Sequence, residues 1–233
     1  MHQIDAAGFH WLEGAWSRII NSMLLASIAD DLGSWFLTQV VNVRQYGVGV
    51  KDGLAQCIHS IRLCLEAGAA QQDPANPYCA LITDISSAFN ELNRDTLFQM
   101  LLLTPDPQGP WVGNLPPGEQ LQVPECLTQW FSVFEVKYDK TTTVRYFKHD
   151  GTFVDIECAA GLHQGCPLGS AAFSAILHVS LAMIMSRHQQ VQVYTYIDNV
   201  TLTGTVRATS AAFDDLQKTI KEDLTLWLNE KEC

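Results

Sequence analysis

Two aspartates, far apart in the sequence, each stand at the end of a short apolar run. Asp84 ends the run 79–84, and Asp198 follows the run 191–197. Runs of this length are typical of buried strands, and carboxylates at the ends of adjacent strands can converge. Magnesium binds hard oxygen ligands and takes few of them from protein. Asp84 and Asp198, with the carbonyl of Ile85, would therefore suit two divalent cations, the arrangement that phosphoryl transfer to a 3′-hydroxyl uses.

Each aspartate also has a simpler structural interpretation. An Asp that follows a strand is often the N-cap of a helix, and Asp198-Asn199 suits a hairpin turn because both residue types tolerate positive φ. Neither aspartate predicts catalysis by itself; the two predict it together, in this order and with a glycine-bounded loop between them. Asn199 would add an oxygen ligand without a charge, which predicts weakened metal binding.

The loop between the aspartates opens a helix. It contains Gln164, Gly165 and Pro167, within the longer string Gly161 to Ser170. Its glycines would let the backbone approach a nucleotide, and Pro167 suits the first turn of a helix. A Gly-Pro helix start is routine, so this loop gains meaning only from its place between the aspartates.

The elements that must position these residues follow from periodicity and turn signals. Their order predicts an α+β fold, with a mainly antiparallel sheet covered on one face by helices. In chain order we expect a helix over 15–36, a glycine-rich loop over 45–53, a helix over 54–67, a strand over 79–84, a turn and helix over 86–103, a proline-rich loop over 104–124, a hairpin over 131–157, a helix over 169–187, a hairpin formed by 191–197 and 200–204, and a helix over 211–228.

Together these motifs resemble the palm of reverse transcriptases, most closely the type found in retrotransposons without long terminal repeats. The resemblance runs from about Arg18 to Cys233. It implies a polymerase right-hand palm over 79–233, interrupted by the loop 104–124, partial fingers over 1–78, and no thumb. It also implies two Mg²⁺ ions, for which Mn²⁺ could substitute, and an RNA template, a DNA primer and dNTPs as partners. A longer parent protein would supply the thumb or other domains.

The resemblance further implies a role for individual residues. Phe89 would stack under the sugar and reject a 2′-hydroxyl, although an aromatic residue here could simply pack the start of a helix. Lys231 would lie near the triphosphate, or would simply be a cation at a helix C-terminus. The implied catalytic residues are Asp84, Asp198, Asn199 and Lys231; the nucleotide pocket is Ile85, Phe89, Gln164, Gly165 and Pro167; the template and primer contacts are Gln45, Gly47, Tyr196, Lys137, Lys140, Arg145 and Lys148.

The charge of the chain favours one rival hypothesis. Its 25 acidic residues outnumber its 14 basic ones and give a net charge of −11, whereas binding to nucleic acid gains affinity from Lys and Arg on phosphates. The chain could thus be a catalytically weakened or inactive remnant that binds nucleic acid or protein, and the basic hairpin around Lys140 could simply be solvated. A third reading is an RNA-dependent RNA polymerase, against which Phe89 argues.

The composition also predicts an intracellular, nuclear or cytoplasmic protein. Seven cysteines without a Cys-x-x-Cys pair fit reduced thiols better than zinc ligands or a disulfide framework. The N-terminus lacks the pattern of a secretory signal. The longest apolar stretch, 171–185, is interrupted by polar residues, so we expect no membrane span.

Overall fold

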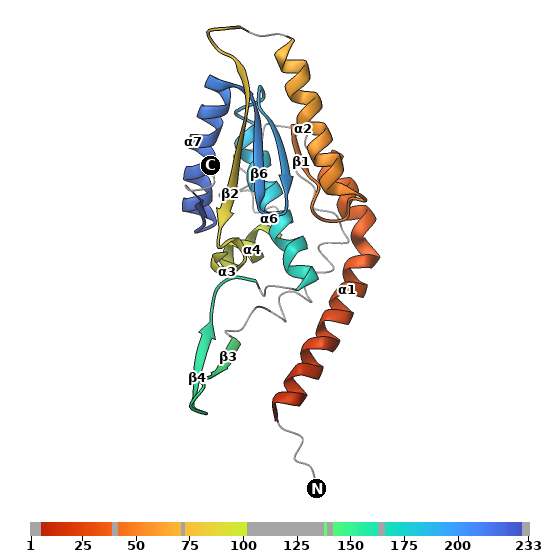
Figure 1. Cartoon of the computed structure of the whole chain (residues 1–233), viewed down its shortest axis with the longest axis vertical. Coiled ribbons are helices and arrows are strands. Elements are labelled where there is room, and N and C mark those ends of the chain that lie inside the picture. The colour runs from red at the N-terminus through yellow and green to blue at the C-terminus, as the bar shows by residue number, and fades with distance from the viewer. Residues whose placement is uncertain are drawn as a thin grey trace.

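A mixed five-stranded sheet forms the centre of the fold, with the strand order β1-β5-β6-β2-β7 (Figure 1). The computed structural model describes residues 6–38, 42–70, 73–101, 138, 142–162 and 166–229. The strands of this sheet are β1 (Val43–Gln45), β2 (Tyr78–Ser86), β5 (Gln192–Tyr196), β6 (Asn199–Thr205) and β7 (Trp227–Leu228). The helices are α1 (Ala6–Thr38), α2 (Gly53–Ala69), α3 (Ala88–Glu91), α4 (Arg94–Leu101), α6 (Pro167–Met185) and α7 (Val206–Asp223).

The sheet is antiparallel except at one edge. β2 pairs with β6, β6 with β5, and β2 with β7, all antiparallel, whereas β1 runs parallel to β5. The predicted α+β class and the two predicted strand regions are therefore confirmed. The expectation of a mainly antiparallel sheet holds for three of its four strand pairings. The strand β1 was not predicted, and its last residue was assigned to a loop, because a strand of three residues shows no periodicity in the sequence.

Side chains alternate between the two faces of each strand, which gives the sheet one apolar and one polar face. Ile85, Val193, Val200 and Leu202 share the apolar face and join the main core with α6 and α7. Asp84, Asn199 and Thr201 belong to the opposite face by the same register. Two of the predicted site residues, Asp84 and Asn199, therefore lie on the polar face.

The core helix α6 is apolar on all sides, as expected for a helix enclosed by other elements. Pro167 occupies its first turn, and all but one of its residues from Leu168 to Met185 are buried. This helix has the length and composition of a membrane span, yet 94% of that stretch is buried inside the fold. A helix in the core of a folded domain has the same character.

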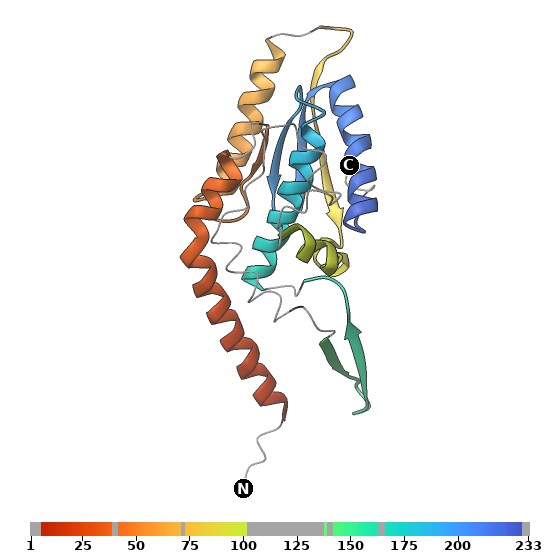
Figure 2. The same cartoon turned by 180° about the vertical axis from the view of Figure 1, so that it is seen from behind.

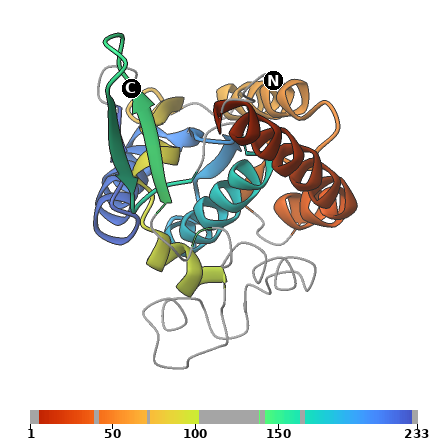
Figure 3. The same ribbon diagram turned by 90° about the horizontal axis from the view of Figure 1, so that it is seen from below.

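Two further helices flank the sheet on its β1 side. α1 contacts β1 and α6 through its second half, while its first half extends past the end of the sheet (Figures 1 and 2). α2 contacts β2, β5 and β6, and seen from below it lies with α1 away from α7 (Figure 3). Because α2 covers part of the polar face, the expectation of helices on one face only was wrong.

The C-terminal part of the fold also departs from the sequence prediction. The final helix starts at Val206 and ends at Asp223, and residues 227–228 form β7 instead of continuing it. Thr225 adopts a left-handed φ of 57°, which a helix does not accommodate. The chain thereby turns back, and β7 pairs with Ile85 and Ser86 at the end of β2.

A separate hairpin projects from the same end as the first half of α1 (Figure 1). It consists of β3 (Thr142–Phe147) and β4 (Phe153–Cys158), which among the described strands pair with each other alone. The predicted hairpin over 131–157 is confirmed for the residues described. Residues 131–137 and the proline-rich loop 104–124 lie outside the described part of the chain.

Candidate metal and nucleotide site

The register of β2 and β6 places Asp84 directly opposite Asn199. Directly opposed residues in an antiparallel pair have Cβ atoms about 4.5–5.5 Å apart and point to the same face. Tyr196 pairs with Asn199 from the other side, so the three side chains form one row across the polar face. The two-residue turn that joins β5 to β6 is Ile197-Asp198, and Asn199 is the first residue of β6. The predicted turn Asp198-Asn199 was therefore displaced by one residue. The structure thus brings Asp84, Asp198 and Asn199 to one end of the sheet.

The two carboxylates influence each other electrostatically. Partial burial raises the pKa of Asp198, and the negative charge of Asp84 raises it further. Hydrogen bonds from its own backbone N–H and from Asn199 act in the opposite direction, the latter from Asn199 Nδ2 to Asp198 Oδ1 at 3.4 Å. Two nearby carboxylates of which one resists ionisation form a site that a divalent cation would stabilise.

The ligand set at this point is small. Among the described residues, no group of three or more His, Cys, Asp or Glu side chains could hold a metal ion. Two carboxylates and one amide nevertheless fit Mg²⁺, which keeps several waters and takes further oxygens from substrate phosphates. Ile85, whose carbonyl was predicted to assist, has its side chain in the core and pairs with Leu228.

The turn that carries Asp198 has an unusual backbone. Ile197 adopts a φ of 58°, a conformation that β-branched residues rarely take. Gln45 lies fully buried beneath it. Its Oε1 accepts hydrogen bonds from the Ile197 N–H at 3.0 Å and the Gly47 N–H at 2.7 Å, and its Nε2 donates to the Ile197 carbonyl at 3.1 Å. The polar atoms of Gln45, predicted to contact the template, are thus bonded within the chain.

Gly47 packs directly against the same turn. A Cβ at this position would lie 2.5 Å from both the backbone N and the Cγ1 of Ile197. Such a distance is far inside van der Waals contact, so only glycine fits here. Gly47 therefore packs against the turn that carries Asp198, and its predicted contact with the template stays a prediction.

β7 brings the end of the described chain beside Asp84. The Asn229 N–H donates to the Asp84 carbonyl at 2.8 Å. This contact adds an edge to the sheet next to the candidate site, which the sequence prediction of a continuous helix did not include. Lys231 lies outside the described residues, so its predicted role near the triphosphate stays a prediction.

Phe89 lies on α3, just after the end of β2. Its ring is partly buried and packs against Phe173 of α6, with ring centroids 5.1 Å apart. The chain enters α3 through Ser87, which has a left-handed φ of 51°. The contact with Phe173 helps to fix the Phe89 ring; its predicted role as a sugar gate stays a prediction.

The loop before α6 docks onto α3. The Leu162 N–H donates to the Phe89 carbonyl at 2.5 Å. Gly161 has a φ of 73° and lies so close to the carbonyls of Phe89 and Asn90 that a Cβ would collide with them. Buried Arg94 donates to the carbonyls of Ala160 and Gly161. The loop therefore approaches the Phe89 region, while Gln164 and Gly165 lie outside the described residues.

The polar face is open near Asp84 and closed at its other end. Ile82, one row away from Asp84, is 59% exposed. Farther along, α2 covers the face: Cys64 Sγ lies 3.1 Å from the Tyr78 hydroxyl and 3.3 Å from Thr203 Oγ1. A ligand on this face could reach the carboxylates but would meet α2 beyond them.

In the hairpin that was predicted to be basic, one of the positive charges is paired with a carboxylate of the same hairpin. Arg145 forms two hydrogen bonds with Asp155, at 2.7 and 2.9 Å, and its guanidinium lies 4.0 Å from the centre of the Phe153 ring. Lys148 is exposed, whereas Lys137 and Lys140 lie outside the described residues. The Arg145 charge is therefore already matched by a carboxylate.

The fold is similar to part of telomerase. A structure of Candida tropicalis telomerase in complex with the TWJ fragment of telomeric RNA matches 98% of this chain and 35% of its own, with a TM-score of 0.58 and 12% identity. The corresponding Candida albicans complex matches 92% of this chain and 34% of its own, with a TM-score of 0.54 and 12% identity. Candida tropicalis telomerase truncated from its C-terminal domain gives a TM-score of 0.51, 13% identity, and coverage of 93% and 39%.

These comparisons establish the fold and nothing finer. The chain spans about a third of the length of the telomerase chains that it matches. No protein-family model and no curated protein sequence matches it.

Proposed function

We propose that this chain is the palm and partial fingers of an RNA-directed DNA polymerase of a retroelement, related to those without long terminal repeats. Telomerase is itself a reverse transcriptase, so the structural similarity supports this class. The single observation that carries the proposal is the convergence of Asp84 and Asp198 at the open end of the polar face. Two carboxylates at adjacent strand ends are what nucleotidyl transfer to a primer 3′-hydroxyl needs from the protein.

Each residue of the site has a defined task in this proposal. Asp84 and Asp198 would hold two Mg²⁺ ions, with Asn199 as a neutral oxygen ligand. When bound, these ions would lower the pKa of the primer hydroxyl and neutralise charge on the triphosphate. Phe89 would exclude a 2′-hydroxyl by its bulk. The loop between Gly161 and Pro167, with Gln164, would hold the incoming dNTP.

The partners of the proposed enzyme follow from what the fold includes. The open face beside Asp84 and Tyr196 would receive the primer and template, with the exposed Lys148 on the hairpin as one phosphate contact. The thumb and further basic surfaces would come from a longer parent protein. Cys57, Cys64, Cys79 and Cys166 are free thiols, which supports the proposal of a nuclear or cytoplasmic location.

The test of the metal site is a Mn²⁺ titration followed by electron paramagnetic resonance, since free Mn²⁺ gives a signal that is lost on binding. The wild-type chain should bind Mn²⁺ more tightly when dNTP is present, because the triphosphate supplies further oxygens. Asp84→Ala should abolish this dNTP-dependent binding while the urea midpoint stays near the wild-type value. Equal binding by both chains would contradict the assignment.

A second function is favoured by one specific observation. Asn199 stands opposite Asp84, and a pair with a single negative charge tolerates the absence of metal better than two facing carboxylates do. A catalytically inactive remnant that binds nucleic acid or protein would have this arrangement. Such a remnant would bind no Mn²⁺ in a dNTP-dependent manner, so the same titration distinguishes the two functions.

A further inference from the structure

The turn that carries Asp198 has a backbone conformation that is unfavourable for one of its residues. Two-residue hairpin turns that need positive φ at the first position usually place Gly there. This turn has Ile197 at that position, with a φ of 58°. A β-branched residue disfavours this conformation through its own Cβ. Something outside the turn must therefore maintain it.

Gln45 holds both peptide groups that flank Ile197. Its Oε1 accepts from the Ile197 N–H, which belongs to the peptide joining Tyr196 to Ile197. Its Nε2 donates to the Ile197 carbonyl, which belongs to the peptide joining Ile197 to Asp198. One amide side chain thus fixes the planes on either side of the strained residue, and the second plane sets where Asp198 begins.

The Gln45 side chain is itself held rigidly. Its backbone lies in the parallel pair with Thr195, and the next residue, Tyr46, donates its N–H to the Thr195 carbonyl at 2.9 Å. Its Oε1 also accepts from the Gly47 N–H at 2.7 Å. Because Gln45 is fully buried, water does not compete for these bonds.

We propose that Gln45 is a positioning residue that holds the Asp198 carboxylate in register with Asp84 by fixing the left-handed Ile197 turn. The proposal rests on the metal site of the proposed function for its consequence, but the contact with the turn is independent of any activity. A neutral amide suits this task because it supplies both a donor and an acceptor and adds no charge beside two carboxylates.

The first measurement is amide hydrogen exchange at Ile197, read by NMR on the whole chain. In the wild type this amide donates to Gln45 and should exchange slowly. Gln45→Leu keeps the approximate bulk and removes both bonding groups, so the Ile197 amide should lose its protection. Gln56→Leu is the matched control, since exposed Gln56 also donates its Nε2 to a backbone carbonyl, that of Lys51 at 2.8 Å, but on α2.

The second measurement is Mn²⁺ affinity, which a generally structural role would not single out. Loss of a residue that orients a metal ligand typically weakens affinity about 10- to 100-fold, and Gln45→Leu should fall in this range while Gln56→Leu stays at the wild-type value. In an Asp198→Ala background, Gln45→Leu should weaken affinity no further, because the two changes act through the same carboxylate.

A second substitution allows the proposal to be tested even if Gln45→Leu folds poorly. Glycine adopts positive φ without strain, so Ile197→Gly should reduce the dependence of the turn on Gln45. Gln45→Leu combined with Ile197→Gly should then fold and bind Mn²⁺ about as tightly as Ile197→Gly alone.

Each outcome has a defined meaning. Lost Ile197 protection together with weaker Mn²⁺ binding, rescued by Ile197→Gly, supports the proposal. Unchanged protection in Gln45→Leu overturns it, and so does lost protection with wild-type Mn²⁺ affinity. A wild-type chain that protects Ile197 through Gln45 but binds no Mn²⁺ would support the contact with the turn and contradict the proposed polymerase function.

Discussion

Asp84 and Asn199 face each other across the β2–β6 pair, and Asp198 stands next to Asn199 in the turn. The site therefore combines two carboxylates that repel each other with one amide that does not. The amide donates to Asp198 and bears no charge opposite Asp84. This arrangement lets the sheet form without a cation while keeping three oxygen ligands at one place.

Replacing the amide by a carboxylate should exchange stability for metal affinity. Asn199→Asp puts like charges directly opposite each other, which should destabilise the metal-free chain by roughly 0.2–1 kcal/mol. Mg²⁺ should reverse this loss and bind more tightly than to the wild type. Urea unfolding in EDTA and in Mg²⁺ measures both effects.

The matched control for that change is Asn76→Asp. Asn76 Oδ1 accepts from the Arg207 N–H at 3.1 Å, a bond that a carboxylate can also accept. Asn76→Asp adds the same charge near the start of β2, away from Asp84. This variant should therefore show no gain in stability when Mg²⁺ is added. An equal gain in both variants would mean that Mg²⁺ acts on overall charge and not at the site.

Removal of the Phe89 ring should change sugar selectivity as well as stability. Phe89→Ala loses the contact with Phe173 and should destabilise the chain by about 0.5–3 kcal/mol. It should also raise the use of NTP relative to dNTP. Competition between the two nucleotides in a primer-extension assay measures the ratio.

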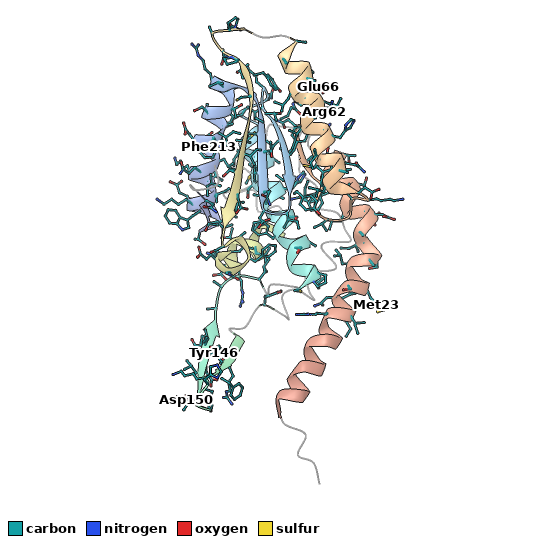
Figure 4. The ribbon with its side chains drawn as sticks, in the orientation of Figure 1. Met23, Arg62, Glu66, Tyr146, Asp150 and Phe213 are labelled. Atoms are coloured by element: carbon teal, nitrogen blue, oxygen red, sulfur yellow. The ribbon has the colours of Figure 1, made fainter. Side chains whose placement is uncertain are left out.

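Phe213→Ala provides the comparison for Phe89→Ala. Phe213 is also partly buried against the main core, but on α7 (Figure 4). It should lose similar stability and leave the ratio of NTP to dNTP use unchanged. If both variants shift that ratio equally, Phe89 has no special role at the sugar.

Buried His178 should make the fold sensitive to acid. It lies on α6 between Trp35 and Phe36, and neither ring nitrogen has a hydrogen-bond partner among the described residues. Burial lowers its pKa from 6.5 to about 3. Because the unfolded chain binds a proton below 6.5 and the folded chain does not, stability is fully present above pH 6.5 and is lost as pH falls toward 3.

His178→Leu should remove this pH dependence at little loss of stability, since it eliminates two unsatisfied polar atoms. The difference in urea midpoint between pH 7 and pH 5 should shrink in His178→Leu. In His59→Leu, which changes an exposed residue of α2, it should stay as in the wild type. An unchanged pH dependence in His178→Leu would show that other groups cause it.

The projecting hairpin should gain affinity for nucleic acid when Arg145 is released. Asp155→Asn removes the carboxylate that pairs with Arg145. One additional phosphate contact should steepen the slope of log K against log salt by about 0.7–0.9. Fluorescence anisotropy with a labelled primer–template at several salt concentrations measures the slope.

Asp150→Asn controls for the change in net charge on that hairpin. Asp150 is exposed at the tip and bonds to Thr152, not to Arg145 (Figure 4). Its removal should alter the salt slope less than Asp155→Asn does. Equal slopes for the two variants would mean that Arg145 makes no phosphate contact.

Part of this site could be predicted from the sequence because its signals are local. The apolar runs before Asp84 and Asp198 marked both strands, and the Asp198-Asn199 pair marked the turn between β5 and β6 to within one residue, since the turn is Ile197-Asp198. The convergence of the carboxylates follows from the pairing of β2 with β6, which the order of motifs made a reasonable inference.

The part of the site that the sequence did not predict depends on pairing between distant segments, which no local sequence signal reveals. Gln45 bonds to Ile197, 152 residues away in the sequence, and it does so because the three-residue β1 pairs with β5. β7 has two residues and owes its conformation to Ile85 and Ser86. Strands this short show no periodicity in the sequence, so their conformation depends on the strands with which they pair.

The most direct test of the central claim is dNTP incorporation on a primed RNA template in Mg²⁺ or Mn²⁺, with Asp198→Ala beside the wild type. The wild-type chain should extend the primer, and Asp198→Ala should reduce extension to background while its urea midpoint stays near the wild-type value. Normal extension by a folded Asp198→Ala chain would contradict the account.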